Sequence, residues 1–305
     1  MAVLKSIARL FYKAWFKISD ICWEFGFLPL PVHYYSPVPS KKELREFDWT
    51  SKSSLVSIPF DEASQINILK RLSKYSSECI WPEHRPKGRL EYYSQNPSFG
   101  FSSACLLYTM IREFKPSNVI EVGGGFSTFI ICQSLQVNSI KEGKAGSVIS
   151  IDPFPNDALR AAQEKYGICV RREPVQRIPV ALFEQLQAGD LLFIDTSHVV
   201  RIGGDVNFLI LEVLPRLHPG VLVHLHDIYL PYEYPRSNYF SSGMKLLWTE
   251  QYLLHAFLCF NTNFKILVAA YWLQMVHSDE SKAAFPSYDS KRHRPSSSFY
   301  IQRVQ

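Results

Sequence analysis

The stretch from residue 117 to residue 152 constrains the fold of this chain more than any other. An apolar run ends at Glu121, passes through three consecutive glycines, and returns as a second apolar run that ends at Asp152. This order predicts a strand, a glycine turn, a helix and a second strand, which together form one βαβ unit of the nucleotide-binding type. Since glycine has no Cβ, the backbone can turn tightly here and approach a ligand closely at the start of the helix. The glycines are Gly123, Gly124 and Gly125.

The spacing of these glycines favours a nucleoside ligand without a diphosphate. A dinucleotide fingerprint needs a further glycine three residues on, but Thr128 occupies that position when the count begins at Gly125. Glu121 is an acid where a pyrophosphate would bind poorly, whereas the carboxylates of Glu121 and Asp152 suit the hydroxyls of a ribose. Two alternatives stay open, which are a glycine turn without any ligand and an oxidoreductase that uses NAD.

In these residues the chain resembles the class I S-adenosylmethionine-dependent methyltransferases, and among them the O-methyltransferases of sugars and other small molecules. The run from Glu121 to Gly125 matches the first motif of that family, and Asp152 matches its second acid. Further matches follow in the same order along the chain. They are GDLLFID at 189–195, LPRLHPGV at 214–221 and the pair His226-Asp227.

The resemblance implies an α/β fold with a Rossmann-like, seven-stranded and mostly parallel sheet. The last strand, expected at 298–303, would insert antiparallel between the fifth and sixth strands. Residues 98–305 would form the methyltransferase domain that binds S-adenosylmethionine. Residues 1–97 would form an N-terminal amphipathic helix and a cap that is partly helical and partly extended.

Carboxylates close four of the expected parallel strands. Because ligands of parallel α/β sheets bind beyond the carboxyl ends of the strands, we expect all four side chains at one pocket. A helix N-cap is the alternative explanation for any single one of them. The four residues are Glu121, Asp152, Asp195 and Asp227.

The resemblance implies S-adenosyl-L-methionine as the cofactor. It also implies which part of the cofactor each candidate residue contacts. Glu121 is expected on the methionine or ribose side, Asp152 at the ribose diol, and Asp195 near the sulfonium. The other cofactor-binding candidates come from the turn and the start of the helix. They are Gly123, Gly124, Gly125 and Ser127.

Two mechanisms stay open on the acceptor side of the pocket. In the first, His198 or His226 acts as a general base beside Asp227 and removes the proton of a hydroxyl acceptor. In the second, Asp195 and Asp227 hold a divalent metal such as Mg²⁺, which lowers the pKa of that hydroxyl. The resembled metal-dependent enzymes have an acid where His226 stands, and imidazole is a poor ligand for Mg²⁺. We therefore favour the metal-free base.

Composition excludes few classes of function. With 47% hydrophobic and 20% charged residues, the 305-residue chain can bury a large core. The formal charge of +5 is small and its basic residues are scattered, so we expect a small-molecule acceptor and no nucleic acid. The six cysteines form no CxxC pair, which favours buried thiols in a reducing compartment such as the cytoplasm.

The N-terminal residues predict a basic amphipathic helix. Its basic residues recur every four positions, and they are Lys5, Arg9, Lys13 and Lys17. Such a helix can lie on an anionic membrane surface, but it lacks the features of a signal peptide. The alternatives are packing on its own domain or against a second subunit in a homo-oligomer.

Several further elements are expected around this core. Helices are predicted at 61–75, 101–114 and 242–260, a sixth strand at 264–272, and a polar loop at 277–298. The aromatic residues of 229–235 would either stack on a sugar or aryl acceptor or form a packed turn. By resemblance, residues before the core would help to cover the cofactor, and they are Tyr93, Asn96, Phe99 and Gly100.

Overall fold

The computed structural model describes residue 15, residues 17–241 and residues 245–305. Contacts divide the chain into two compact units, of which the first takes in 1–49 and 239–247 and the second takes in 50–238 and 248–305. The second unit carries the sheet and the candidate site. The prediction of a functional boundary between residues 97 and 98 stays a prediction. Residues 50–97 belong to the second unit because helix α3 (Glu62–Leu72) packs against strand β6 and helix α4.

Seven strands form one sheet in the order β3-β2-β1-β4-β5-β7-β6. Strands β1 to β5 pair in parallel, and β7 pairs antiparallel with both β5 and β6. The predicted sheet, including its antiparallel last strand between the fifth and sixth, is confirmed. The strands are β1 (Asn118–Val122), β2 (Ser147–Ile151), β3 (Cys169–Arg171), β4 (Leu191–Ile194), β5 (Leu222–Leu225), β6 (Phe264–Ala269) and β7 (Phe299–Arg303).

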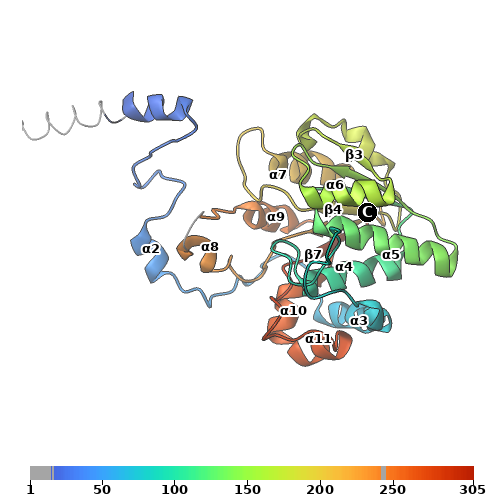
Figure 1. Cartoon of the computed structure of the whole chain (residues 1–305). Helices are drawn as coiled ribbons and strands as arrows, with labels where there is room; N and C mark the ends of the chain where they lie inside the picture. Colours follow the sequence, from blue (N-terminus) through green and yellow to red (C-terminus); the bar gives the residue numbers. More distant parts are fainter. Residues whose placement is uncertain (1–14, 16, 242–244) are drawn as a thin grey trace, which may run out of the picture. The chain divides into compact units, whose positions relative to one another are not determined.

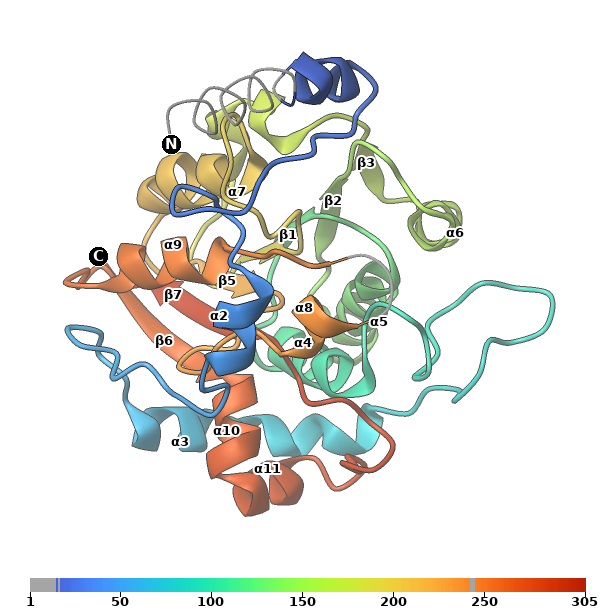
Figure 2. The same cartoon turned by 90° about the vertical axis from the view of Figure 1, so that its left-hand side faces the viewer.

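The central strands β4 and β5 are buried along their whole length because helices cover both faces of the sheet. Every residue of β4 and of β5 is buried, as expected for parallel strands between two layers of helices. Figure 2 shows α4, α5 and α6 on one side of the sheet and α7 and α9 on the other. The remaining helices of the second unit include α10 and α11 (Figure 1). The bounds are α4 (Phe101–Phe114), α5 (Phe126–Glu142), α6 (Asp157–Tyr166), α7 (Asp205–Phe208), α8 (Ser237–Phe240), α9 (Glu250–Leu258), α10 (Ala270–Val276) and α11 (Ser278–Ala284).

The first unit contains a helix at residues 17–24 and the short helix α2 (Lys41–Glu46). Ser40 caps α2, since its hydroxyl accepts a hydrogen bond from the Glu43 N–H and the Glu43 carboxylate accepts one from the Ser40 N–H. Of the four basic residues predicted to share a helix face, only Lys17 is among the described residues. None of the described helices combines the length and the apolar character that crossing a bilayer requires.

Three predicted elements differ from the structure. Part of the helix expected over 242–260, at 242–244, lies outside the described residues; within them the helix begins at Glu250, because Thr249 has a non-helical backbone and donates its N–H to His198. The strand expected to reach residue 272 ends at Ala269 and continues as helix α10. Part of the loop expected over 277–298 is helix α11.

The prediction that the cysteines are buried thiols is only partly right. Three of them are buried, but Cys169 on the edge strand β3 is exposed. Strand β3 has a neighbour on one side only, which leaves part of it open to solvent.

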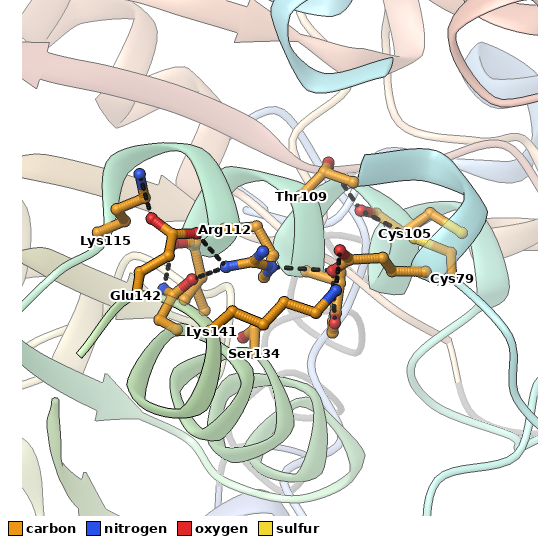
Figure 3. Close-up of polar contacts among 12 residues, drawn as sticks. Cys79, Cys105, Thr109, Arg112, Lys115, Ser134, Lys141 and Glu142 are labelled. Atoms are coloured by element: carbon orange, nitrogen blue, oxygen red, sulfur yellow. Dashed lines mark hydrogen bonds and ion pairs between the residues drawn. The ribbon is translucent and has the colours of Figure 1, made fainter. Parts of the chain in front are cut away.

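A buried ion-pair network joins helices α4 and α5 to the turn that follows α3 (Figure 3). At its centre the Arg112 guanidinium donates to Glu78 at 2.8 Å and to Glu142 at 2.9 Å, and also to Asn138. Each carboxylate has a second cation, with Lys141 at 2.8 Å from Glu78 and Lys115 at 2.5 Å from Glu142. Every charged group in this cluster is therefore paired, and we call the cluster the Arg112 network. Its members are Glu78, Arg112, Lys115, Asn138, Lys141 and Glu142.

Candidate active site

The turn after β1 needs glycine at its first position. Gly123 has a φ of +83°, and a Cβ built there would lie 1.7 Å from the carbonyl oxygen of Asp195. Any side chain would therefore push the ends of β1 and β4 apart. At the third glycine, the Gly125 N–H donates to the Thr128 hydroxyl as helix α5 begins. The predicted close approach of the main chain to a ligand depends on the positive φ and the missing Cβ of Gly123.

Glu121 lies beneath the turn and is completely buried. Its carboxylate accepts hydrogen bonds from the hydroxyls of Ser127 (2.8 Å), Thr128 (2.7 Å) and Ser150 (2.8 Å). Burial raises the pKa of Glu121 to about 7, although these three hydrogen bonds favour the charged form. Through these hydrogen bonds, Glu121 and Ser127 hold the turn against β2. Their predicted contact with the cofactor stays a prediction.

Asp152 lies at the end of β2 and reaches back to the turn. Its Oδ2 accepts a hydrogen bond from the Gly124 N–H (3.2 Å), and its Oδ1 accepts one from the Phe154 N–H (2.7 Å). Beside it is a cavity of about 330 Å³ at the carboxyl ends of β1, β2 and β4, within the size range of small-ligand sites. Its lining includes Gly123, Asp152, Phe154, Val175, Asp195 and Arg201.

The residues that line the cavity offer the kinds of contact that an adenosine needs. Carboxylates at Asp152 and Asp195 offer acceptors for hydroxyl groups, and the apolar side chains of Phe154 and Val175 offer flat contacts for a base. The bare main chain at Gly123 lets a ligand approach the sheet. Three of the predicted cofactor-binding residues thus line one cavity, whereas Glu121 and Ser127 lie behind it.

His198 lies among three carboxylates next to the β4 end of this cavity. Its Nε2 is 3.2 Å from an oxygen of Asp195 and 3.7 Å from an oxygen of Asp227. Its Nδ1 is 2.7 Å from an oxygen of Glu250. The side chains of Asp195 and Asp227 are 30% and 21% exposed, while those of His198 and Glu250 are 7% and 1% exposed. A ligand would therefore meet the two aspartates first, with the imidazole just behind them.

The carboxylates control the charge of this imidazole. Burial by itself would lower the pKa of His198, but hydrogen bonds to Asp195 and Glu250 outweigh burial and hold that pKa well above its usual value. Burial likewise opposes the ionisation of Asp195, yet the neighbouring His226 and His198 lower its pKa. The neighbouring carboxylates therefore favour the protonated form of this imidazole.

Asp227 and His226 follow β5; Asp227 lies 3.7 Å from His198, and the His226 Nε2 atom lies 3.9 Å from Asp227. Asp227 has a φ of +56°, which is unusual for a residue other than glycine. Its Oδ1 accepts a hydrogen bond from the Ser297 hydroxyl at 2.7 Å. His226 packs on the ring of Phe99 at 5.0 Å between centroids, and its Nδ1 has no hydrogen-bond partner among the described residues.

Two contributors to the site were not predicted. Glu250 is 52 residues from its partner His198, and Ser297 is 70 residues from its partner Asp227. Neither residue belongs to a local motif. One weak signal for Ser297 was available, because it immediately precedes a strand expected beside the fifth.

Strand order and site together define the class of the protein. The sheet order, the glycine turn after β1 and the acids at the ends of β1, β2, β4 and β5 are those of a class I methyltransferase. A family model described as a methyltransferase domain matches residues 120–228. This segment contains the predicted catalytic and cofactor-binding residues from Glu121 to Asp227, whereas the residues expected to cover the cofactor, at 93–100, precede it. Residues 120–228 are therefore similar to a methyltransferase domain, in agreement with the class I resemblance of the sequence.

Similar proteins were found among curated sequences and solved structures. An uncharacterized protein of Archaeoglobus fulgidus is 28% identical over 185 residues, which cover 56% of this chain and 80% of that protein. A solved chain described as "cmcI-N160 SAH" aligns over 92% of this chain and 98% of its own, with 12% identity and a TM-score of 0.40. A putative protein-L-isoaspartate O-methyltransferase of Plasmodium falciparum, in complex with S-adenosyl-L-homocysteine, covers 55% of this chain and 84% of its own, with 11% identity and a TM-score of 0.31.

Proposed function

We propose that this chain transfers the methyl group of S-adenosylmethionine to a hydroxyl oxygen of a sugar or another small metabolite. The observation that carries the proposal is the position of the His198 Nε2 atom, 3.2 Å from Asp195 and 3.7 Å from Asp227. A hydroxyl that receives a methyl group must lose its proton, and an imidazole at this position is suited to take it. Asp227 would orient the acceptor hydroxyl from the end of β5.

When bound, S-adenosylmethionine supplies an electrophilic methyl carbon, so the C–S bond breaks as the acceptor oxygen forms the new C–O bond. The hydroxyl proton passes to Nε2 of His198, and S-adenosylhomocysteine remains as the second product. In the free site, Asp195 and Glu250 raise the pKa of His198. Next to a sulfonium, Asp195 has a second positive charge to compensate, which favours the neutral imidazole that the reaction needs.

Replacing Asp152 tests cofactor binding directly. For Asp152→Ala we expect the affinity for S-adenosylhomocysteine, measured by calorimetry, to fall by at least tenfold, or about 1.4 kcal/mol. The matched control is Asp157→Ala, since Asp157 is an exposed acid on the neighbouring helix α6. Unchanged affinity in Asp152→Ala would count against the assignment. A rise in melting temperature with NAD, and none with S-adenosylhomocysteine, would favour an oxidoreductase.

Aromatic side chains beside the site support a sugar or aryl acceptor. Tyr229 and Tyr232 both make edge contacts with Tyr271, at 5.0 and 5.3 Å between ring centroids. The Tyr229 hydroxyl is 3.5 Å from an oxygen of Asp227. Aromatic faces next to hydrogen-bonding groups are a common lining of small-ligand sites. A panel of sugar and phenol acceptors with tritiated S-adenosylmethionine tests this choice, and transfer to neither class contradicts it.

A metal-assisted reaction is the second candidate mechanism. In the part of the chain that the structure describes, ligand atoms of Asp195, His198 and Asp227 all lie within 4.8 Å of one another. Two carboxylates and an imidazole fit a transition metal better than Mg²⁺, and such an ion would lower the pKa of a bound hydroxyl. Methyl transfer that survives exhaustive EDTA treatment would exclude this mechanism. Activity lost with EDTA and restored by a divalent ion would exclude the metal-free one.

A non-catalytic scaffold protein with the same fold is the alternative function. Its working surface would be the first unit, where large apolar side chains are exposed beside Lys17. They include Trp15, Ile18, Ile21, Trp23 and Phe25. Tryptophan and basic residues together suit an anionic membrane surface. Flotation with anionic but not neutral vesicles, together with no tritiated methyl transfer into a cell extract, would favour the scaffold. Self-association without flotation would instead indicate a homo-oligomer.

A further inference from the structure

Glu250 is a deeply buried carboxylate whose side chain reaches the back of the candidate site. It is the first residue of helix α9 and is 1% exposed. Its Oε2 is 2.7 Å from His198 Nδ1, and its Oε1 has no hydrogen-bond partner among the described residues. An ionised carboxylate is costly to bury when only one of its oxygens is satisfied. A role in positioning His198 would explain why the Glu250 carboxylate is buried at this place.

The three residues that lead into α9 hold His198 from several directions. The N–H groups of Thr249 and Glu250 both donate to the His198 carbonyl oxygen, at 2.8 and 3.1 Å. The Thr249 hydroxyl accepts a hydrogen bond from the Val200 N–H at 2.7 Å. The ring of Trp248 packs on the imidazole at 4.7 Å between centroids. Main chain and side chain of His198 are thus fixed by one short segment, 248–250.

The backbone of His198 needs this support. Its φ is +59°, in the left-handed region that residues other than glycine rarely adopt. Strained backbone of this kind persists only where the surrounding structure enforces it, and it is concentrated at functional sites. The two hydrogen bonds to the His198 carbonyl supply that enforcement. They also explain why α9 begins at Glu250, since Thr249 takes a non-helical conformation in order to donate to His198.

We propose that Glu250 is a positioning residue. Its carboxylate accepts a hydrogen bond from the Nδ1–H group of His198 and thereby keeps Nε2 directed at Asp195 and Asp227. This inference rests on the proposed function, which gives Nε2 its task. Carboxylates that orient an imidazole through its second nitrogen are a general device in proteins. The device serves both candidate mechanisms, because a base and a metal ligand each need Nε2 turned toward the pocket.

Stabilisation of the fold is the competing explanation for Glu250. A buried ion pair is weak evidence for stability, because desolvation offsets most of the attraction. If stability were its only role, changes at Glu250 and at His198 would affect the melting temperature and leave the geometry of the reaction alone. The two explanations therefore predict different measurements.

The first experiment observes the proton on Nδ1 by histidine-ring ¹⁵N NMR of the full chain saturated with S-adenosylhomocysteine. The signal of His198 is assigned by its absence in His198→Asn. In the wild type we expect a slowly exchanging Nδ1–H, which is lost in Glu250→Leu. Glu250→Gln keeps an acceptor oxygen and provides a second variant should Glu250→Leu not fold, with a weakened signal expected. Asp190→Asn is the matched control, since Asp190 is a buried carboxylate at the opposite ends of the strands.

The second experiment is a double-mutant cycle on methyl transfer. Tritiated S-adenosylmethionine at saturation and a deproteinised cell extract serve as the probe. We expect a 10- to 100-fold slower transfer in Glu250→Leu with S-adenosylhomocysteine affinity within twofold of wild type. If Glu250 acts through His198, the double variant with His198→Asn should be no slower than His198→Asn alone.

The outcomes separate this inference from the proposed function. An Nδ1–H signal that survives in Glu250→Leu, or rate losses that add in the double variant, would overturn the positioning role. A wild-type chain that neither binds S-adenosylhomocysteine nor transfers methyl would overturn the proposed function. In that case the NMR measurement on the free protein still decides whether Glu250 orients His198.

Discussion

Two buried clusters of charge in this protein differ in how completely their charges are paired. The Arg112 network holds three cations against two carboxylates, and each carboxylate contacts two of the cations (Figure 3). At the candidate site, three carboxylates surround one imidazole. The first arrangement is complete without a ligand and joins helices to each other. The second has an excess of negative charge beside a cavity, which suits a cationic cofactor or a metal ion.

This comparison implies that changes in the Arg112 network should alter folding stability, whereas changes at the site should alter chemistry. Among the described residues, the buried atoms without a hydrogen-bond partner include Glu250 Oε1, His226 Nδ1 and Thr196 Oγ1, and others lie elsewhere in the fold. Unsatisfied polar atoms are costly, so a ligand that bonded to any of these three would remove part of that cost.

The largest effect is expected for His198→Asn. Loss of a general base typically costs about 10²- to 10⁴-fold in rate, so tritiated methyl transfer should fall by that range. The affinity for S-adenosylhomocysteine should stay within twofold, as measured by calorimetry. The control is His255→Asn, on α9 but away from the cluster. A rate within threefold of wild type would contradict the expectation that changes at the candidate site alter the chemistry.

For Arg112→Met we expect a loss of folding stability with no change in the site. The loss should stay below about 3 to 5 kcal/mol, which is the cost of breaking a fully buried ion pair, since Glu78 and Glu142 are partly exposed and keep Lys141 and Lys115. Urea unfolding measures the loss, and calorimetry on the folded protein should give wild-type affinity for S-adenosylhomocysteine. Reduced affinity at unchanged stability would show that the Arg112 network belongs to the site after all.

Two buried glutamates, Glu121 beneath the glycine turn and Glu78 in the Arg112 network, should respond to pH in opposite directions. Burial raises the pKa of Glu121 from 4.5 to about 7, so the native state binds the proton more tightly than the unfolded state. The stability that this proton confers is complete below about pH 4.5 and is lost as pH rises to 7. At 1.36 kcal/mol per pKa unit, the full loss is about 3 kcal/mol. Glu121→Gln should remove this part of the pH dependence in urea unfolding between pH 4.5 and 8.

Glu78 in the Arg112 network should behave in the reverse way. Burial opposes its ionisation, but Arg112, Lys141 and Tyr108 outweigh burial and lower its pKa from 4.5 to about 2. Its contribution to stability is therefore present above about pH 4.5 and disappears as pH falls toward 2. If the stability of a Glu78→Gln variant fell between pH 4.5 and 2 as steeply as that of the wild type, this difference between Glu78 and Glu121 would be contradicted.

The smallest effect is expected for Lys141→Ala. Lys141 lies at the rim of the Arg112 network and its side chain is 54% exposed. Exposed ion pairs contribute about 0 to 1 kcal/mol, and Arg112 still compensates Glu78 in this variant. Urea unfolding should give a loss inside that range, which shrinks further in 1 M salt. A loss as large as that of Arg112→Met would mean that stability in the network does not depend on burial.

Much of the fold could be predicted from the sequence because its signals are local. Apolar runs closed by acids located the parallel strands, and the glycine turn at 123–125 located the first βαβ unit. The helix over 101–114 was predicted with its observed bounds. Segments without a strong period fared worse, as at 242–260, where an apolar pattern concealed the non-helical residue Thr249. Local pattern cannot reveal a backbone donor that is used by a distant loop.

The sequence by itself determined which side chains stand at the ends of the parallel strands, since alternating strands and helices bring those ends to one edge of a sheet. That pattern predicted Asp152, Asp195 and Asp227 at one edge of the sheet. Only the tertiary structure decided which of these acids face the cavity and which partner holds His198. The reason is physical: the bond between Glu250 and His198 joins the start of a helix to a loop 52 residues away, and only packing brings the two together.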